Sequence, residues 1–191
     1  CEALVAQTNE AFGGVDILVN NAALFVDIPR RSFLHIGSEE WDKVMAVNVR
    51  GSFNCAKAVV PAMQARAAGS IINISSSTAL KGIPFTLHYV TSKGAIIAMT
   101  RALARELGDD NIRVNAISAG PIKTLAASGI GDFRYILKWN ELNSPLRRNV
   151  GIDEVGGAGV YLLSDLSTGV TGEIHHVDCG YNTVGMHLDS T

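Results

Sequence analysis

Short, mostly apolar runs alternate along this chain with longer stretches of helical periodicity. The runs lie at residues 17–19, 71–74 and 112–117, and each ends in small or polar residues. Such runs are typical of parallel strands that are buried on both faces of a sheet. Parallel neighbours need a crossover between them, which is usually a helix. The pattern therefore predicts an α/β fold with a doubly wound parallel sheet and helices on both faces.

The helical stretches can be placed from their spacing and their end signals. Glycines follow the first predicted helix at Gly13-Gly14 and the third at Gly108, whereas Ser38 with Glu39-Glu40 marks the start of the second and Asp153 caps the fourth. The four predicted helices span residues 2–12, 38–63, 89–107 and 153–163. A loop-rich stretch covers residues 120–149, and Glu173–Val177 is predicted to form a last strand.

Composition narrows the class of protein. The 191 residues are 47% hydrophobic and 18% charged, which suits one globular domain over residues 1–191 with a substrate loop at about 120–150. A net charge of -2 argues against nucleic acid or a membrane surface as a partner. No apolar stretch reaches the roughly 18 residues that span a bilayer. Three widely spaced cysteines indicate neither a disulfide framework nor a zinc site, so we expect a cytoplasmic protein without a metal.

The strongest chemical signal is a tyrosine four positions before a lysine, Tyr89 and Lys93. This spacing places a phenol and an ammonium on one face of one helix. A nearby cation favours the phenolate and lowers the pKa of the phenol, which would let Tyr89 exchange a proton. The motif is common by chance, so a solvated helix face is the alternative interpretation.

Polar residues at the ends of the predicted strands support a ligand site. Ser76 stands at the end of the run 71–74, and ligands bind at the carboxyl ends of parallel strands. The alternative for this serine and its neighbours is that they cap backbone groups. After the first run, Asn21 could brace the sheet while Ala22 leaves room for a flat ligand. Asn48 lies beside a glycine within a helical stretch, and a local function would explain the cost of that glycine.

Together these features resemble the short-chain dehydrogenase/reductase family over nearly the whole chain. The matching segments are Asn20–Ala23, Asn48, Ser76, Tyr89 with Lys93, and Arg113–Ile117. The resemblance implies a Rossmann-like fold and NAD or NADP as cofactor. The family's first strands and Gly-rich phosphate-binding turn would precede Cys1, so we expect an N-terminally truncated domain that lacks about 60 residues, at about 30 residues per βαβ unit.

The resemblance also implies roles for single residues. Tyr89 would be the general acid/base, and Lys93 would lower its pKa and hold the nicotinamide ribose. Ser76 would polarise the substrate oxygen and Asn48 would hold a water of the proton relay. Asn21 and Ala22 would lie along the adenosine half of the cofactor. Ile122 and Thr124 would contact its carboxamide end.

Two branches of the family are represented along the chain. The front half is similar to carbonyl/alcohol oxidoreductases, whereas residues 118–133 and 172–178 are similar to bacterial enoyl-acyl-carrier-protein reductases. Those reductases carry their catalytic tyrosine seven positions before the lysine, where this chain has Thr86. They carry a second tyrosine where this chain has Ser76.

We therefore predict NAD(P)-dependent oxidoreduction of a carbonyl/hydroxyl pair as the leading function. Reduction of an enoyl-acyl-carrier-protein thioester in fatty acid synthesis is the second hypothesis, and a noncatalytic fragment without a cofactor site is the third. The stretch 125–149 would form a mobile lid whose apolar residues contact a small-molecule or acyl-thioester substrate, or would pack as an ordinary helix. Small residues at Gly94, Ala95 and Ala98 favour a homodimer or homotetramer, although they could simply pack against the sheet.

Overall fold

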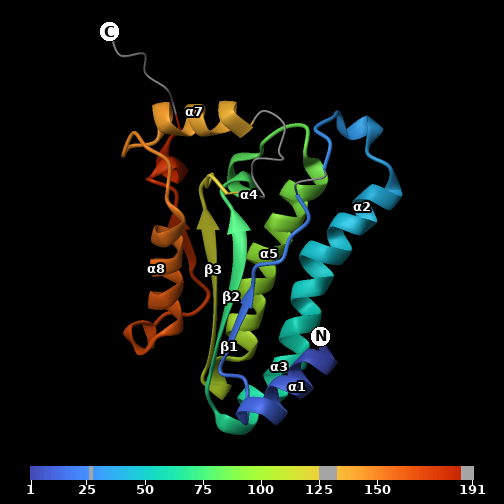
Figure 1. Ribbon diagram of the computed structural model, residues 1–191, viewed down its shortest axis with the longest axis vertical. Coiled ribbons are helices and arrows are strands. Elements are labelled where there is room, and N and C mark those ends of the chain that lie inside the picture. The colour runs from blue at the N-terminus through green and yellow to red at the C-terminus, as the bar shows by residue number, and fades with distance from the viewer. Residues whose placement is uncertain (26–27, 125–132, 186–191) are drawn as a thin grey trace.

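A parallel sheet of four strands runs through the centre of the structure (Figure 1). The structure is a computed structural model of the chain, and it describes residues 1–25, 28–124 and 133–185. The strands lie in the order β1-β2-β3-β4, with the bounds β1 (Ile17–Asn20), β2 (Gly69–Ser76), β3 (Ile112–Ala119) and β4 (Ile174–Val177). All three neighbouring pairs are parallel, so the carboxyl ends of the strands share one edge of the sheet.

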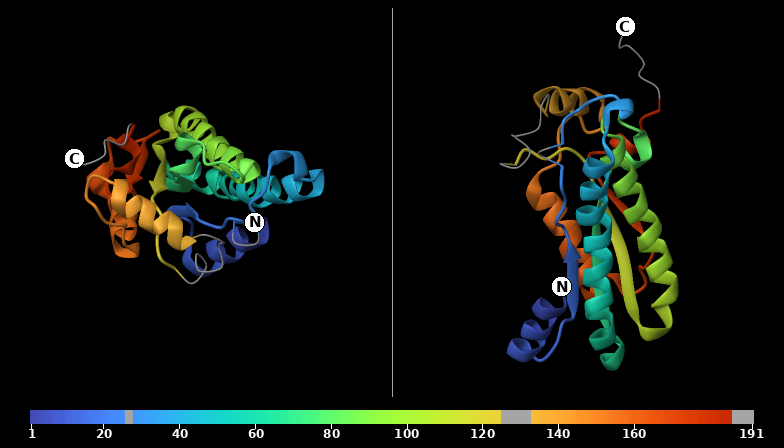
Figure 2. Two further views of the ribbon diagram at one scale, coloured as in Figure 1. Left: turned by 90° about the horizontal axis from the view of Figure 1, so that it is seen from above. Right: turned by 90° about the vertical axis from the view of Figure 1, so that its right-hand side faces the viewer.

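Helices cover both faces of the sheet, as the sequence predicted. α3 (Gly51–Arg66) and α5 (Leu87–Glu106) lie on one face and α8 (Ile152–Leu163) on the other. α1 (Glu2–Phe12) lies beside the lower end of α3 and projects from the sheet edge (Figure 2). α7 (Phe133–Asn143) crosses above the carboxyl ends of the strands. The short helical turns are α4 (Thr78–Lys81), Phe33–His35, Gly108–Asp110, Asp165–Ser167 and Tyr181–Thr183.

The strands supply both cores through the alternation of their side chains. Ile71 packs with the residues of α3 and α5, whereas its neighbour Ile72 packs with Leu162 of α8. Val114 and Ile117 of β3 divide in the same way between the two faces. Successive residues of a strand point to opposite faces, so the uninterrupted apolar runs follow from burial on both sides. The doubly wound, Rossmann-like arrangement is confirmed.

The second predicted helix is divided in the structure. The stretch 38–63 forms α2 (Ser38–Met45), a π-helical turn at Ala46–Arg50, and α3. A π turn holds one more residue than an α turn and often marks a functional position. The turn contains Asn48, which is 2% exposed. The prediction of one regular helix was therefore wrong at the position that the sequence had marked as unusual.

Two other predictions about helices need correction. Asp153 does not cap α8, because Gly151 holds the N-cap position and its N–H donates to the carboxylate of Glu154 at 2.8 Å. The stretch 120–149 is not only loop, since α7 occupies its second half. Part of the predicted lid, residues 125–132, lies outside the described residues.

The edge strand β1 is more open than the rest of the sheet. Ile17 and Val19 are 47% and 46% exposed, although the sequence predicts burial on both faces. No helix within the described ranges is long and apolar enough to cross a lipid bilayer.

Candidate active site

Tyr89 lies in the first turn of α5, at the carboxyl edge of the sheet. Its side chain is 9% exposed and its ring packs on that of Phe25, with 4.0 Å between the ring centroids. Burial raises the pKa of Tyr89 to about 12, and a hydrogen bond with the Ser76 side chain acts in the opposite direction. The phenol therefore holds its proton at neutral pH and is placed to donate it.

Lys93 follows one turn later on the same helix, as the spacing predicted. Its ammonium lies 5.7 Å from the centroid of the Tyr89 ring and donates to the carbonyl of Ile74 at 2.7 Å. Burial lowers the pKa of Lys93 to about 8. We expected Lys93 to lower the pKa of Tyr89, and this prediction was wrong for the chain as it stands. Desolvation favours the neutral form of both groups, and for Tyr89 it outweighs any nearby charge.

Ser76 ends β2 directly beside Tyr89. Its hydroxyl accepts hydrogen bonds from the backbone N–H and the hydroxyl of Thr78, at 3.3 and 3.0 Å. Ser76 thus meets the phenol and also caps the turn that follows, as the alternative interpretation predicted, whereas its contact with a substrate oxygen stays a prediction. Its neighbour Ser75 is structural, because its hydroxyl donates to the carbonyl of Lys93 at 3.1 Å.

Asn48 is joined to the same helix through a buried amide. Its Nδ2 donates to the hydroxyl of Ser92 at 2.9 Å and to the carbonyl of Leu24 at 3.2 Å, while its Oδ1 accepts from the N–H of Leu24 at 2.6 Å. Ser92 in turn donates to the carbonyl of Tyr89 at 2.7 Å. The amide therefore ties the segment after β1 to the turn of α5 that carries Tyr89. Its predicted role in holding a water stays a prediction.

A cleft of about 510 Å³ opens beside Tyr89. Its lining comes from Phe25 and Arg30, the ends of β2 and β3 with the residues that follow them, the stretch from Ile83 to Tyr89, α7, and Tyr181. Phe133, Ile136 and Trp139 are apolar residues of the predicted lid 125–149, and all three line the cleft. The lining is mainly apolar and includes the hydroxyl-bearing side chains of Ser76 and Tyr89.

The predicted cofactor contacts divide into two groups. Ile122 and Thr124 line the cleft together with Tyr89, so the structure brings this pair to the site. Asn21 and Ala22 are exposed just after β1, at the carboxyl edge but outside the lining of this cleft. The residue that braces the sheet is Asn20 rather than Asn21, because the amide of Asn20 donates to Oδ1 of Asn73 at 2.8 Å.

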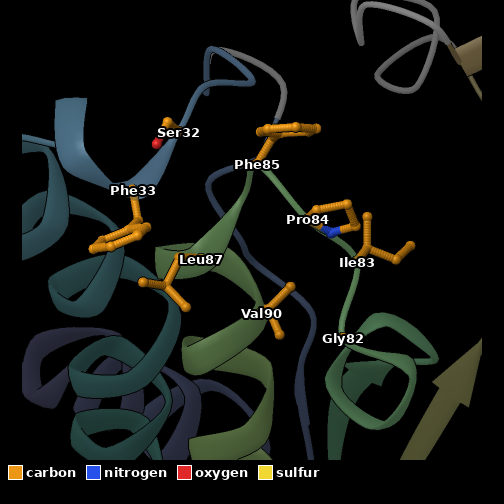
Figure 3. Close-up of a pocket in the computed structure, with 8 residues that line it drawn as sticks. All are labelled: Ser32, Phe33, Gly82, Ile83, Pro84, Phe85, Leu87 and Val90. Carbon is orange, nitrogen blue, oxygen red and sulfur yellow. The ribbon is translucent and has the colours of Figure 1, made fainter.

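A second, shallower hollow of about 320 Å³ lies on the outer side of the same wall. Figure 3 shows that its lining comes from two segments, Ser32 and Phe33 before α2 and the stretch from Gly82 to Val90. Ile83 and Pro84 line both the hollow and the cleft. This stretch of chain is therefore a thin partition between the Tyr89 cleft and the molecular surface.

A partly buried cluster of Arg31, Glu40 and His88 was missed by sequence reasoning. Glu40 of α2 accepts a hydrogen bond from Arg31, and its other oxygen lies 2.9 Å from Nε2 of His88. His88 is fully buried and directly precedes Tyr89. Arg31 also donates its backbone N–H to the carbonyl of Phe85 at 3.0 Å. The one available signal, Glu39-Glu40, had been interpreted only as a helix start.

His175 and His176 lie on β4, and the ring of His175 faces that of Tyr161 at 6.2 Å between centroids. The described part of the chain contains no group of three or more histidine, cysteine, aspartate or glutamate side chains that could hold a metal ion.

Comparison with known proteins identifies the family. The family model described as "Enoyl-(Acyl carrier protein) reductase" matches residues 1–182. The chain is 48% identical over 187 residues to "Enoyl-[acyl-carrier-protein] reductase [NADH] 1" of Rhizobium meliloti (strain 1021), which covers 97% of this chain and 68% of that protein. It is 38% identical over 176 residues to a 3alpha-hydroxysteroid dehydrogenase of Mediterraneibacter gnavus, covering 92% of this chain and 68% of that protein.

The fold agrees with the same assignment. The crystal structure of an enoyl-(acyl-carrier-protein) reductase from Anaplasma phagocytophilum in complex with NAD matches with a TM-score of 0.89 and 41% identity, covering 97% of this chain and 70% of that one. The expected nicotinamide cofactor agrees with the cofactors printed for these relatives. The family model and these two reductases favour enoyl reduction over the carbonyl/hydroxyl chemistry that the sequence ranked first. The chain belongs to the enoyl-(acyl carrier protein) reductase family of short-chain dehydrogenase/reductase oxidoreductases.

Proposed function

We propose that this chain carries the substrate site of an NADH- or NADPH-dependent reductase that acts on 2-enoyl thioesters. The observation that carries the proposal is a protonated, buried phenol, Tyr89, at the wall of a mainly apolar cleft. An acyl chain suits the apolar lining, and a thioester carbonyl suits the adjacent hydroxyl groups of Ser76 and Tyr89. The name of the Rhizobium meliloti relative, which contains "[NADH]", supports the choice of reaction and cofactor.

The residues near Tyr89 fit a nicotinamide nucleotide. The Lys93 ammonium has three donor hydrogens, and its one hydrogen bond to another described residue goes to Ile74. The remaining donors suit the hydroxyls of a ribose. Ile122 and Thr124 would contact the carboxamide end. When bound, the cofactor supplies a hydride to the substrate carbon that is conjugated with the carbonyl.

The chain's own residues would manage the oxygen and the proton. With the cofactor bound, negative charge would develop on the thioester oxygen during reduction, and the Tyr89 hydroxyl would donate a hydrogen bond to it. Ser76 lies beside Tyr89 and can donate a second one. Phe25 packs on the ring and helps to exclude water. The Tyr89 proton would then pass to the enolate oxygen, and the resulting enol would tautomerise to the saturated thioester. Lys93 would stabilise the phenolate that remains.

A substrate comparison tests this proposal. Purified chain is supplied with NADH or NADPH and either a 2-enoyl thioester or a 3-oxoacyl thioester of equal chain length. We expect loss of reduced cofactor with the enoyl substrate and a saturated thioester as product. Exclusive turnover of the 3-oxoacyl thioester would overturn the assignment.

Reduction of a carbonyl to an alcohol is the second candidate. The contact between Ser76 and Tyr89 favours it, because two adjacent hydroxyls can hold one carbonyl oxygen. The steroid dehydrogenase at 38% identity supports the same chemistry. Changing Ser76 separates the two: Ser76→Ala should abolish ketone reduction but only weaken enoyl reduction, in which Tyr89 alone can hold the oxygen.

Cofactor binding distinguishes the two reductase hypotheses from the third hypothesis, a noncatalytic fragment. The chain spans 68% of the length of its Rhizobium meliloti relative. Calorimetric titration with NADH and with NADPH measures binding directly. Heat of binding for either nucleotide would exclude the noncatalytic hypothesis, and none for both would support it.

We also propose that the protein acts in the cytoplasm as a homodimer or homotetramer that uses the outer face of α5. Ala98 is exposed there, and a Cβ added at Gly94 would meet no atom within 4 Å, so the face is open in the single chain. Light scattering with Ala98→Arg tests the assembly. We expect a smaller mass than for the matched surface variant Gln7→Arg on α1, whereas equal masses would contradict this interface.

A further inference from the structure

Two of the three cysteines, far apart in sequence, meet between α1 and α3. The Sγ atoms of Cys1 and Cys55 lie 3.3 Å apart, within the range of a weak thiol hydrogen bond. Cys1 is the N-cap of α1, and its carbonyl accepts the first helical hydrogen bond, from Val5 at 3.0 Å. Cys55 lies in the second turn of α3. The helices thus bring the two thiols together through backbone that is already ordered.

The Cys1 and Cys55 thiols are more exposed to solvent than the thiol of the third cysteine, Cys179. Cys1 is exposed and Cys55 is half-buried, whereas Cys179 is buried, with 8% exposure, beyond the other end of β4. Burial also raises the pKa of the Cys179 thiol, which disfavours its reactive thiolate. An external reagent can therefore react first with Cys1. The Cys55 thiol is then close enough to attack the modified Cys1 sulfur.

The helix that carries Cys1 is weakly held. None of the 11 residues of α1 is buried, and Leu4 and Phe12 are 65% and 83% exposed. Val5 of α1 packs against the core but is only partly buried. A covalent link between α1 and α3 would therefore restrain an element that side-chain packing leaves loose.

We propose that Cys1 and Cys55 form a redox-active dithiol that closes to a disulfide with a small disulfide oxidant, and that closure fixes α1 to α3. The sulfurs must approach from 3.3 Å to the bond length of about 2 Å, which small side-chain rotations can supply. This inference does not rest on the proposed function, because it needs neither cofactor nor substrate.

Glutathione disulfide would oxidise the dithiol in two successive thiol–disulfide exchange steps. The Cys1 thiolate attacks one sulfur of glutathione disulfide, forms a mixed disulfide and releases one glutathione thiolate. The Cys55 thiolate then attacks the Cys1 sulfur, forms the intramolecular bond and releases the second glutathione. Two electrons pass from the protein dithiol to the oxidant, and the two protein thiol protons end on the two glutathione thiols.

Mass spectrometry after treatment with glutathione disulfide tests the pair. We expect the wild-type chain to lose two hydrogens, to yield a peptide that links Cys1 to Cys55, and to leave Cys179 open to alkylation after unfolding. Cys55→Ser should instead retain a glutathione adduct on Cys1, because no second thiol can displace it. Cys179→Ser is the matched control and should form the link as the wild type does.

Proteolysis measures the restraint on α1. The protease that cleaves after glutamate can cut at the exposed Glu10, and oxidation should slow this cut several-fold in the wild type but not in Cys55→Ser. A bridge to Cys179, a stable glutathione adduct on wild-type Cys1, or unchanged cleavage after complete oxidation would each overturn the proposal.

Discussion

The helices α5 and α1 lie on opposite sides of the sheet (Figure 2) and are held very differently. α5 has 20 residues, of which eight are buried, among them Tyr89 and Lys93. α1 has 11 residues and none is buried. Both were predicted from the same kind of periodicity. The comparison teaches that the candidate chemistry is carried by the helix whose orientation is fixed by packing, which is what a precise proton donor requires.

The largest expected effect comes from removing the phenol of α5. Tyr89→Phe keeps the ring that packs on Phe25 but deletes the proton donor, so kcat should fall by about 10²- to 10⁴-fold. Steady-state kinetics with the enoyl thioester measures the loss, and circular dichroism checks the fold. Normal turnover in this variant would remove Tyr89 from the chemistry.

Truncation of one apolar side chain on each helix sharpens the contrast in packing. Ile96→Ala in α5 should lower the free energy of unfolding by about 2 to 5 kcal/mol, because Ile96 is only 2% exposed. Leu4→Ala in α1 should change it by less than about 0.5 kcal/mol, since Leu4 is 65% exposed. Urea unfolding measures both. Similar losses would mean that α1 is covered in solution.

The burial of the ionisable pair on α5 should appear in the pH dependence of stability. Between pH 8 and pH 10.5 the unfolded chain keeps the Lys93 proton and the folded chain loses it, so stability should rise with pH, by about 3 kcal/mol. Above pH 10 the unfolded chain loses the Tyr89 proton, which the folded chain keeps to about pH 12, so stability should fall.

Urea unfolding across this range measures both limbs of the pH profile. Lys93→Met should flatten the rise, and Tyr89→Phe should flatten the fall. If the profile of either variant matched that of the wild type, the corresponding group would not be buried as described.

The smallest expected effect concerns the cluster of Arg31, Glu40 and His88, which ties the segment before α2 to α5. Glu40→Gln replaces the carboxylate that faces both Arg31 and His88, so the free energy of unfolding should fall by about 1 to 3 kcal/mol. The neighbouring Glu39→Gln is the matched control and should be neutral within about 0.5 kcal/mol, because Glu39 is exposed. Equal effects of the two changes would show that the cluster does not anchor this segment.

Much of the fold could be predicted because its signals are local. The apolar runs at 71–74 and 112–117 identified central strands, and glycine or capping residues marked most helix ends. The grouping of Ser76, Tyr89 and Lys93 also followed from local spacing and from the rule that strand ends share an edge. These predictions needed no knowledge of which distant residues meet.

The remainder depends on contacts between distant segments. The half-exposure of Ile17 and Val19 is set by what covers the edge strand rather than by their own apolar character. The direction of the Tyr89 pKa shift depends on how closely the surrounding chain excludes water. The cluster of Arg31, Glu40 and His88 joins three segments, and no short motif announces it.

The π turn at Ala46–Arg50 limits how this site can change by mutation. Its extra residue rotates every later side chain of α3 around the helix axis. No single substitution can therefore restore regular α-helical geometry while both faces of α3 keep their positions. Deleting one residue of the turn would restore the ordinary winding, but it would swing Asn48 away from Leu24 and Ser92. The π turn can therefore be lost when one codon is deleted, but stepwise substitutions largely leave it in place.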